Sequence, residues 1–304
     1  MSEQRRSDPL PLGGEHGLPY SKGLMARALM AVGVPVDRAY ELALRVERDL
    51  EARGAAVAEL SRLEELAAET LGETEGCDVI RRLRRYRELR ELDLPIILLI
   101  GGATGTGKST LATEVAYRLG ITRVTSTDFV RQTMRGFFAH EFMPTVHYSS
   151  FEAGLGLPAA EQETGDPVIL GFLEQTRNVL VGVRASIDRA LEEGWSMVLE
   201  GVHLVPGMLP RSIEGALVIE CVLEIPDERM HSSHFFIRDL ASEERRPVAK
   251  YLDRIHDIRR IQRYIVDRAG KTGVPVIENR GLEPSIAALM ELVVSGAESI
   301  QERV

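Results

Sequence analysis

The sequence has little cysteine, no long hydrophobic run and no excess of positive charge. Its two cysteines, Cys77 and Cys221, lie far apart, which argues against both a disulfide framework and a zinc site. No apolar run is long enough to span a bilayer, and the N-terminus lacks the apolar core of a signal peptide. We therefore expect a cytoplasmic protein with no membrane partner.

The charge balance restricts the class of partner. The formal net charge is -9, which argues against nonspecific binding of nucleic acid, because such binding depends on an excess of Lys and Arg. A local group of basic side chains can still hold a small anionic substrate. Hydrophobic residues make up 44% of the 304 residues and charged residues 27%, as is typical of a globular protein rather than a disordered one.

One stretch has the pattern of a phosphate-binding loop. Residues 99–110 read LIGGATGTGKST and contain G-x-x-x-x-G-K-[ST] from Gly102 to Ser109. The apolar run at 94–100 is typical of a buried parallel strand, and the residues after the loop repeat at helical spacing until Gly120. Strand, loop and helix occur in the order that the motif requires, so we predict that the loop binds nucleotide phosphates.

Each residue type in this loop has an expected role. Glycines let backbone N–H groups converge on phosphates without obstruction by side chains. The Lys108 ammonium is expected to contact the outer phosphates of ATP, and the Ser109 hydroxyl to reach Mg²⁺. The predicted nucleotide-binding residues are Gly102, Ala103, Thr104, Gly105, Thr106, Gly107, Lys108, Ser109 and Thr110.

A mainly helical region precedes the loop. After a polar start that extends to about residue 19, helical patterns cover 21–30, 37–53, 57–71 and 77–92. The last pattern is rich in Arg but also contains Glu88 and Glu91, which favours a solvated helix face over an anion-binding patch. We predict a small helical domain over 1–92 and a P-loop domain over 93–304.

Strand and helix patterns alternate beyond the loop, which is typical of an α/β fold. Together with the first strand, four further strands predict a parallel five-stranded sheet with helices on both faces; they cover 122–127, 196–199, 216–225 and 274–277. Helices are expected at 129–138 and from the Asp166–Pro167 pair to Glu193. Two long connections separate these elements, an irregular one at 141–165 and a largely helical, Arg-rich and His-rich one at 226–271, where a mobile lid would lie.

A carboxylate follows the second predicted strand. In an open parallel sheet, this strand end faces the same crevice as the phosphate loop, so we predict that Asp128 orients and deprotonates the acceptor hydroxyl. The alternative role, an N-cap of the next helix, is compatible with the first. Arg131 and Arg135 lie four apart on one helix face and either hold anionic groups of the substrate or form a solvated pair.

The third predicted strand also ends in a carboxylate. Glu200 resembles the second acidic motif of phosphate-loop enzymes, with Glu in place of the commoner Asp. We predict that it holds Mg²⁺ through a water, or acts as the base in place of Asp128; the alternative is a strand-end charge that faces solvent. His203, three residues later, is at least as consistent with a structural histidine.

The predicted lid supplies further cations. We expect Arg238 and one of Arg245 or Arg246 to close over the transferring phosphate, which makes all three catalytic candidates, although a solvated charge run is the alternative. His231 and His234 have the spacing of metal ligands, but no third ligand is spaced to complete a site.

Two other segments carry candidate binding residues. In the irregular connection, His147, Ser149 and Ser150 either contact a small polar substrate by hydrogen bonds or belong to a solvated loop. After the fifth strand, Asn279 and Arg280 lie in a position from which adenine could be recognised.

Five motifs together resemble the 2-phosphoglycerate kinase family. They are GGATGTGKST, STDFVRQTMR, HYSSF, LEGVHLVP and IRRIQRY, and the resemblance covers about residues 95–285. Members of that family make 2,3-bisphosphoglycerate from ATP and 2-phosphoglycerate, so the resemblance implies that Lys108, Ser109, Asp128 and the lid arginines have the roles given above. Such a substrate carries a carboxylate and a phosphate and needs several cations, which could come from Arg131, Arg135, Arg238, Arg245, Arg246 and Lys250.

The N-terminal region carries a shorter resemblance. Residues 18–27, LPYSKGLMAR, are similar to the start of the ATP-cone-like segment of archaeal members of the family. This implies a regulatory unit, while the alternative is a helical interface that forms a homodimer.

The sequence as a whole predicts an ATP- and Mg²⁺-dependent kinase that phosphorylates a hydroxyl of a small anionic hydroxy acid, with 2-phosphoglycerate as the first choice. One alternative is a kinase of a sugar acid or nucleoside. The other is a nucleotide-responsive regulatory ATPase, and Asp128 together with the basic lid favours the kinase.

Overall fold

The computed structural model describes residues 20–91, 94–163, 165–241 and 248–301. The chain forms two compact units, one of Met1–Asp93 with Met290–Val304 and one of Leu94–Leu289. None of the helices within the described ranges is long and apolar enough to cross a membrane. The predicted domains 1–92 and 93–304 differ from these units in the placement of the C-terminal residues, and an ion pair within the first unit, Arg85 with Glu298, gives a reason for that grouping.

The first unit contains the four predicted helices. They are α1 (Lys22–Ala31), α2 (Val36–Arg53), α3 (Leu60–Leu71) and α4 (Glu73–Glu91). Ser21 caps α1 by accepting a hydrogen bond from the Leu24 N–H, and α3 begins later than the predicted residue 57. Arginines of α4 are ion-paired, as Arg81 is with Asp78, which fits the solvated helix face expected there.

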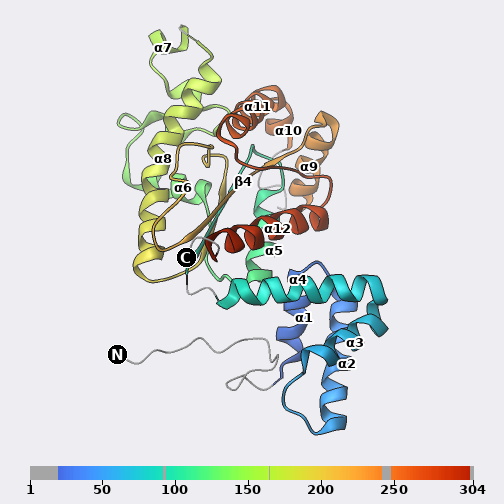
Figure 1. Ribbon diagram of the computed structural model, residues 1–304. Coiled ribbons are helices and arrows are strands. Elements are labelled where there is room, and N and C mark those ends of the chain that lie inside the picture. The colour runs from blue at the N-terminus through green and yellow to red at the C-terminus, as the bar shows by residue number, and fades with distance from the viewer. Residues whose placement is uncertain (1–19, 92–93, 164, 242–247, 302–304) are drawn as a thin grey trace. The chain divides into compact units, whose positions relative to one another are not determined.

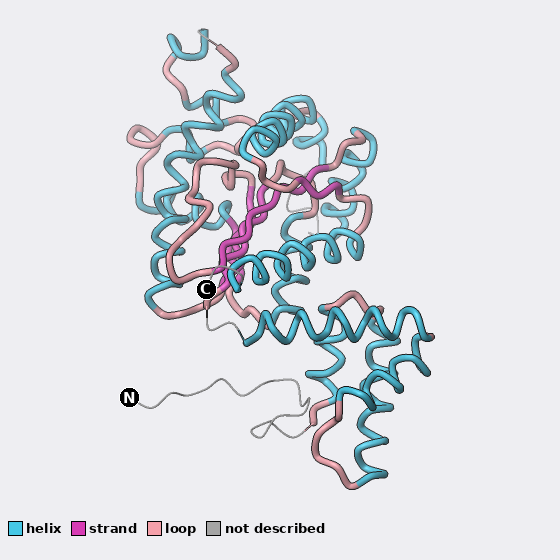
Figure 2. Tube along the Cα trace, in the orientation of Figure 1, coloured by secondary structure: helices cyan, strands magenta, loops and turns pink. Residues whose placement is uncertain are grey.

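The second unit is built on a β-sheet, drawn in magenta in Figure 2. Its five strands lie in the order β2-β3-β1-β4-β5, and every pair is parallel, as the sequence predicts. The strands are β1 (Ile96–Gly101), β2 (Val124–Ser126), β3 (Met197–Gly201), β4 (Leu217–Glu224) and β5 (Val276–Glu278). β1 is central, and the chain turns to one side of it for β2 and β3 and to the other for β4 and β5. In such a sheet, ligands bind outside the carboxyl ends of the strands where the order reverses.

The bounds of all five strands differ from the prediction by one or two residues, and the ends of β2 and β3 are the differences that concern the site. β2 ends at Ser126 rather than at residue 127, because Ser126 caps the helix that follows and Thr127 already belongs to it. β3 continues past the predicted end at Leu199, because Glu200 and Gly201 still pair with β1. Glu200 is therefore held in the last two residues of a paired strand rather than in a loop.

Helices cover both faces of the sheet (Figure 1). On one face, Ile97 and Leu99 of β1 pack with Val179 and Val183 of α8. α6 and α11 lie on this face as well. The remaining residues of β1 point to the other face, because side chains alternate along a strand. There α5 packs against β1 and β3. The bounds are α5 (Lys108–Leu119), α6 (Thr127–Phe137), α8 (Pro167–Glu192), α11 (Ile255–Thr272) and α12 (Leu282–Gln301).

The connection predicted to be irregular contains short helices. They are η1 (Pro144–His147), η2 (Ala153–Gly156) and α7 (Ala159–Glu163), and Asp166 then caps α8 as predicted. η2 packs against α8 so closely that a Cβ on Gly171 would lie 2.2 Å from the Gly154 nitrogen. The connection is thus held on the core by backbone contact. The region predicted as a lid contains α9 (Glu228–Ala241) and α10 (Val248–Leu252).

Candidate active site

The predicted phosphate-binding loop joins β1 to α5. Residues 102–107 form the turn, and Lys108, Ser109 and Thr110 form the first turn of α5, where free N–H groups favour anions. Side chains hold the loop in shape: the Thr106 hydroxyl donates to the Ala103 carbonyl at 3.0 Å, and the Asn279 amide donates to the Thr106 carbonyl at 2.9 Å.

The position of Asn279 after the fifth strand suggested adenine recognition, but its observed contact is with the loop. Its carbonyl oxygen also accepts from the Ser285 hydroxyl at 3.2 Å, so its amide is used within the protein. Arg280 is 79% exposed and paired with Glu278 at 2.6 Å. Asn279 directly follows β5 and supports the loop through its bond to the Thr106 carbonyl.

Lys108 is buried beneath the loop. Its ammonium donates to the Ala103 carbonyl at 2.6 Å. Burial lowers the pKa of Lys108, while the nearby carboxylates of Glu200 and Asp128 act to raise it. In this position the ammonium lies inside the loop, where it would neutralise the charge of bound phosphate oxygens.

Ser109 and Glu200 form the candidate metal site. The Ser109 hydroxyl donates to Glu200 Oε1 at 2.9 Å, and Glu200 is only 6% exposed at the end of β3. Burial raises the pKa of Glu200, an effect that Lys108 and the Ser109 hydrogen bond oppose. A bound cation would relieve this burial penalty, and two oxygen atoms are the ligand type that Mg²⁺ prefers, so the pair fits the metal.

The described residues supply only part of a metal coordination shell. Within the described ranges, no group of three or more His, Cys, Asp or Glu could hold a metal ion. Mg²⁺ commonly uses one or two protein oxygens and completes its shell with phosphate oxygens and water. The Ser109–Glu200 pair matches that pattern.

Asp128 lies in the first turn of α6 and does not cap the helix. Ser126 is the cap, because its hydroxyl accepts from the Phe129 N–H at 3.0 Å. The Asp128 side chain is 63% exposed and lies 3.4 Å from Arg131 Nε. Burial acts to raise the pKa of Asp128, but the positive charges of Arg131 and Lys108 and the hydrogen bond from Arg131 oppose it, and that pKa is lowered. The carboxylate is thus kept ionised and free to accept a proton or a hydrogen bond.

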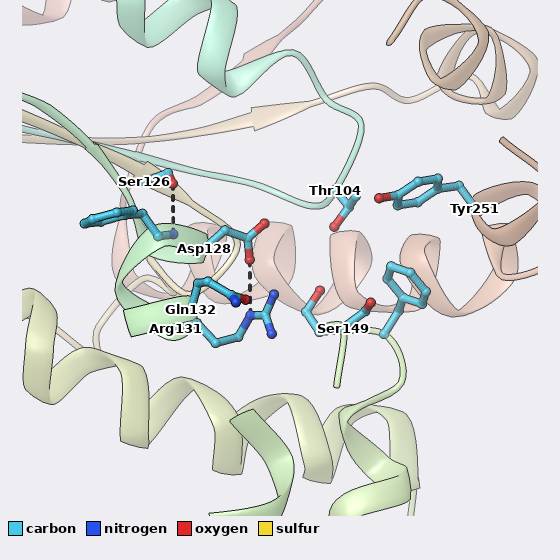
Figure 3. Close-up of a pocket in the computed structure, with 10 residues that line it drawn as sticks. Thr104, Ser126, Asp128, Arg131, Gln132, Ser149 and Tyr251 are labelled. Carbon is cyan, nitrogen blue, oxygen red and sulfur yellow. Dashed lines mark hydrogen bonds and ion pairs between the residues drawn. The ribbon is translucent and has the colours of Figure 1, made fainter. Parts of the chain in front are cut away.

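A pocket of about 450 Å³ opens between Asp128 and the phosphate loop (Figure 3). Asp128 and Arg131 come from α6, whereas Thr104 comes from the loop and faces them across the pocket. The lining residues are Thr104, Ser126, Asp128, Phe129, Arg131, Gln132, Ser149, Ser150, Phe151 and Tyr251. The pocket therefore brings the predicted nucleotide-binding loop and the predicted acceptor residues to one space.

Some of the predicted substrate residues have contacts elsewhere. Arg135 donates to Gln132 Oε1 at 3.1 Å, His147 bonds to the Phe138 carbonyl at 3.0 Å, and Lys250 pairs with Glu152 at 2.7 Å. None of these three is among the residues that line the pocket. The candidate catalytic residues Arg245 and Arg246, and the side chain of Arg238, lie outside the described residues.

Arg131 has a structural role besides its place in the pocket. Its side chain is 13% exposed, and Nη1 donates at 3.0 Å to both the Val146 and Tyr148 carbonyls. These bonds tie α6 to the end of η1, which leads to Ser149 and Ser150. Arg131 therefore both contributes positive charge to the pocket and holds in place the segment that leads to Ser149 and Ser150.

A buried network that the sequence did not predict supports the same segments. Gln175 Nε2 donates to the carbonyls of Thr145 and Tyr148, which leaves Gln175 Oε1 to accept from His203 Nε2 at 2.9 Å. His203 Nδ1 then accepts from the Thr127 hydroxyl at 2.8 Å. His203 is fully buried, which lowers its pKa to about 4 and keeps it neutral. It is a structural histidine that connects β3, α6, α8 and η1.

One signal for this network is present in the sequence. Gln175 falls at helical spacing among Phe172, Val179 and Val183, so it is a polar residue in an apolar stripe. A buried amide at such a position requires hydrogen-bond partners. Its partner, however, is 28 residues away in sequence, and the stripe alone does not identify it.

The comparisons with known proteins concern nearly the whole chain. No family model matches it. A protein of Pyrococcus furiosus is 37% identical over 290 residues, which cover 95% of this chain and 94% of that protein. One of Methanothermobacter thermautotrophicus is 37% identical over 296 residues, 96% of each, and one of Thermococcus kodakarensis is 38% identical over 274 residues, 90% and 92%. Each of the three is named 2-phosphoglycerate kinase.

Proposed function

The chain belongs to the 2-phosphoglycerate kinase family, and from this premise we propose that it transfers the terminal phosphoryl group of ATP to the free hydroxyl of 2-phosphoglycerate. Membership makes it a kinase, a phosphotransferase with a hydroxyl acceptor. The products of the proposed reaction are ADP and 2,3-bisphosphoglycerate: an oxygen–phosphorus bond forms at the acceptor, the bond to ADP breaks, and the hydroxyl loses its proton.

One observation supports the proposal above the others. Thr104 of the phosphate loop and Asp128 of α6 line the same pocket and face each other across it. Phosphoryl transfer requires the donor and acceptor to be held in line more than it requires covalent chemistry by the protein. A pocket shared by the two sets of residues provides such positioning.

The surroundings of the two carboxylates favour a division of roles. Glu200 is buried and already hydrogen-bonded to Ser109, which suits a metal-holding residue. Asp128 is exposed to the pocket, which suits the residue that orients the acceptor hydroxyl and takes its proton. When bound, Mg²⁺ would supply neutralisation of the phosphate charge during transfer. We therefore assign Asp128 as the base and Ser109 with Glu200 as the metal-holding pair.

The acceptor proposed here carries both a carboxylate and a phosphate. Among the described residues that line the pocket, Arg131 supplies the positive charge, and the hydroxyls of Ser149 and Ser150 supply hydrogen-bond donors. The remaining charge must be balanced by cations that reach the pocket from neighbouring segments. Our proposed sources are Arg238, Arg245, Arg246, Arg135 and Lys250.

The proposal is tested by turnover with a panel of acceptors. The protein is incubated with ATP, Mg²⁺ and either 2-phosphoglycerate, 3-phosphoglycerate, glycerate, a sugar acid or a nucleoside, and ADP release is measured with phosphorus NMR of the product. We expect release above the acceptor-free rate with 2-phosphoglycerate and a signal from 2,3-bisphosphoglycerate. Release with another acceptor alone would reassign the substrate, and no stimulation by any acceptor would contradict the kinase site.

A further inference from the structure

Four rings form a column beside the pocket. His231 and Phe235, one turn apart on α9, stack with centroids 5.6 Å apart, and Phe235 stacks on Tyr251 of α10 at 5.0 Å with planes only 7° apart. Tyr251 in turn meets the edge of Phe151 at 5.9 Å. Such aromatic pairs contribute beyond the area that they bury, so the column joins α9, α10 and the segment after η1 as one packed body.

One end of the column holds the phosphate loop. His231 Nε2 lies 2.8 Å from the Thr104 carbonyl, which can only accept, so Nε2 carries the proton. The ring of Phe235 lies against Gly105: a Cβ on that glycine would come within 2.5 Å of the ring, so only glycine permits this contact. The loop and α9 are in direct contact at these two residues.

Among the described residues, the contact made by His231 leaves one of its buried ring nitrogens unpaired, which lowers the stability of the fold. This unfavourable energy indicates that the contact has a role beyond packing. The His231 side chain is fully buried, and its Nδ1 has no hydrogen-bond partner in the part of the chain that the structure describes. Burial lowers the pKa of His231 to about 4, so the neutral ring has a single N–H, and the Thr104 carbonyl receives it. Leaving a buried acceptor unpaired disfavours folding, and a leucine would avoid that penalty.

The His231 contact sets the direction of a loop N–H group. The peptide unit between Thr104 and Gly105 is planar and trans, so its C=O and N–H point in opposite directions. Because the Thr104 carbonyl points to His231, the Gly105 N–H points away from α9. The orientation of this donor in the phosphate-binding loop is therefore coupled to the position of α9.

The other end of the column forms a side of the acceptor pocket. Phe151 and Tyr251 both line the pocket, next to Ser149 and Ser150. Tyr251 points toward Thr104 in Figure 3, so the loop and the column meet at the pocket as well. A shift of α9 that follows phosphate binding would move the Tyr251 ring, because stacked rings cannot slide apart without loss of contact.

We propose that His231, Phe235 and Tyr251 are positioning residues that couple the two substrate sites, so that nucleotide binding at the phosphate loop arranges the acceptor pocket and the acceptor strengthens nucleotide binding. The coupling is reciprocal, as binding linkage requires. The identity of the acceptor as 2-phosphoglycerate rests on the proposed function, but the coupling between loop and pocket does not.

The first test measures coupling directly. The dissociation constant of a non-hydrolysable ATP analogue with Mg²⁺ is measured by calorimetry with and without saturating 2-phosphoglycerate. Couplings of this kind change affinity about 5- to 150-fold, and we expect about a tenfold gain in the wild type. Phe235→Leu should reduce this gain to less than about twofold. Phe236→Leu is the matched control, because Phe236 is the next residue on α9 but is 52% exposed and outside the column. An undiminished gain in Phe235→Leu would overturn the proposal.

A second measurement separates this proposal from the identity of the acceptor. Hydrogen exchange is followed in peptides that cover 148–152 and 248–254, with the ATP analogue as the only ligand. We expect slower exchange in both peptides for the wild type and for Phe236→Leu, and no change for Phe235→Leu. If 2-phosphoglycerate does not bind but this protection is present, the coupling stands and the substrate is wrong. Absence of protection in the wild type would overturn the coupling, whatever the turnover assay shows.

A pair of variants at Tyr251 guards against loss of folding in Phe235→Leu, since Phe235 is buried. Tyr251→Phe keeps the stacked ring, whereas Tyr251→Leu removes it, and thermal melts establish that each is folded. The coupled gain and the exchange protection should persist in Tyr251→Phe and disappear in Tyr251→Leu. Equal loss in both variants, or loss in neither, would contradict a role for the ring.

Discussion

Asp128 follows the end of β2 by two residues, and Glu200 lies in the last two residues of the neighbouring strand β3, where it is in register with Ser126 of β2. Their surroundings nevertheless differ, because Glu200 bonds to Ser109 below the phosphate loop while Asp128 faces the pocket beside Arg131. Two carboxylates in distinct environments can carry distinct roles in one reaction. The residue-scale predictions follow from that difference.

Asp128→Asn should lower kcat about 10²-fold or more, because an amide cannot accept the hydroxyl proton. The affinity for the ATP analogue should change little, since Asp128 is on the opposite side of the pocket from the loop. Steady-state kinetics and calorimetry measure the two quantities. Turnover near the wild-type rate would mean that Asp128 is not the base.

Glu200→Gln should raise the Mg²⁺ concentration needed for half-maximal activity about tenfold, the lower end of effects that follow loss of a metal-supporting carboxylate. A Mg²⁺ titration at saturating substrates measures this change. Glu220→Gln is the control, because Glu220 is also a strand carboxylate but lies within β4, four residues before its end, whereas Glu200 bonds to Ser109 at the start of α5. If the two variants have the same Mg²⁺ dependence as the wild type, Glu200 does not hold the metal.

Lys108→Ala should reduce phosphoryl transfer by orders of magnitude, because the loop loses its buried cation. The fold should survive, since Lys108 Nζ bonds only to groups within the loop among the contacts described. Turnover and circular dichroism report the two effects. A variant that unfolds would show that the cation is needed for structure as well.

The predictions for individual site residues rest on local chemistry. The loop motif predicts Lys108 and Ser109, and the strand-end rule predicts Asp128. The same reasoning could not predict that Asn279 supports the loop or that His231 does, because both contacts join segments more than 100 residues apart. Such contacts depend on how the sheet arranges its connections.

At the scale of elements, a helix cap determines where the helix that carries a site residue begins. Ser126 ends β2 and starts α6, and this places Asp128 in the first helical turn. Ser126→Ala should lower the free energy of unfolding by about 1 kcal/mol, the usual effect of losing an N-cap. It should also raise the KM for the acceptor, because Asp128 loses its fixed position.

The matched control for this variant is Ser21→Ala, which removes the cap of α1 in the other unit. Its effect on urea unfolding should be similar in size, while its kinetic constants should equal those of the wild type. Equal acceptor KM values in Ser126→Ala and Ser21→Ala would show that the cap does not position Asp128.

At the scale of the whole molecule, buried histidines link stability to pH. His203 and His231 each have a folded-state pKa of about 4, below the ordinary value of 6.5. Between these values the unfolded chain binds more protons than the folded chain, so the free energy of unfolding decreases as pH falls from 6.5 toward 4. The stabilisation is fully present above pH 6.5.

Urea unfolding at pH 7.5, 6 and 5 tests this linkage. His203→Gln should show a smaller loss of stability over this range, since it removes one of the two groups. His256→Gln should behave as the wild type does, because His256 is exposed. A pH dependence that is identical in all three proteins would exclude His203 as a source.

The sequence by itself determined the five-stranded parallel sheet, the glycine-rich loop between its first strand and the following helix, and the position of a carboxylate just after the second strand. Those features follow from local patterns: alternation of strand and helix, glycine spacing, and the crevice at the ends of parallel strands. Only the tertiary structure decided which side chains surround the pocket. Strand order brings β1, β2 and β3 together, and buried polar groups such as Gln175 and His203 must then find partners from distant segments. The tertiary structure also joined His231, Phe235 and Tyr251 into a column, because packing is a property of assembled elements and not of any one of them.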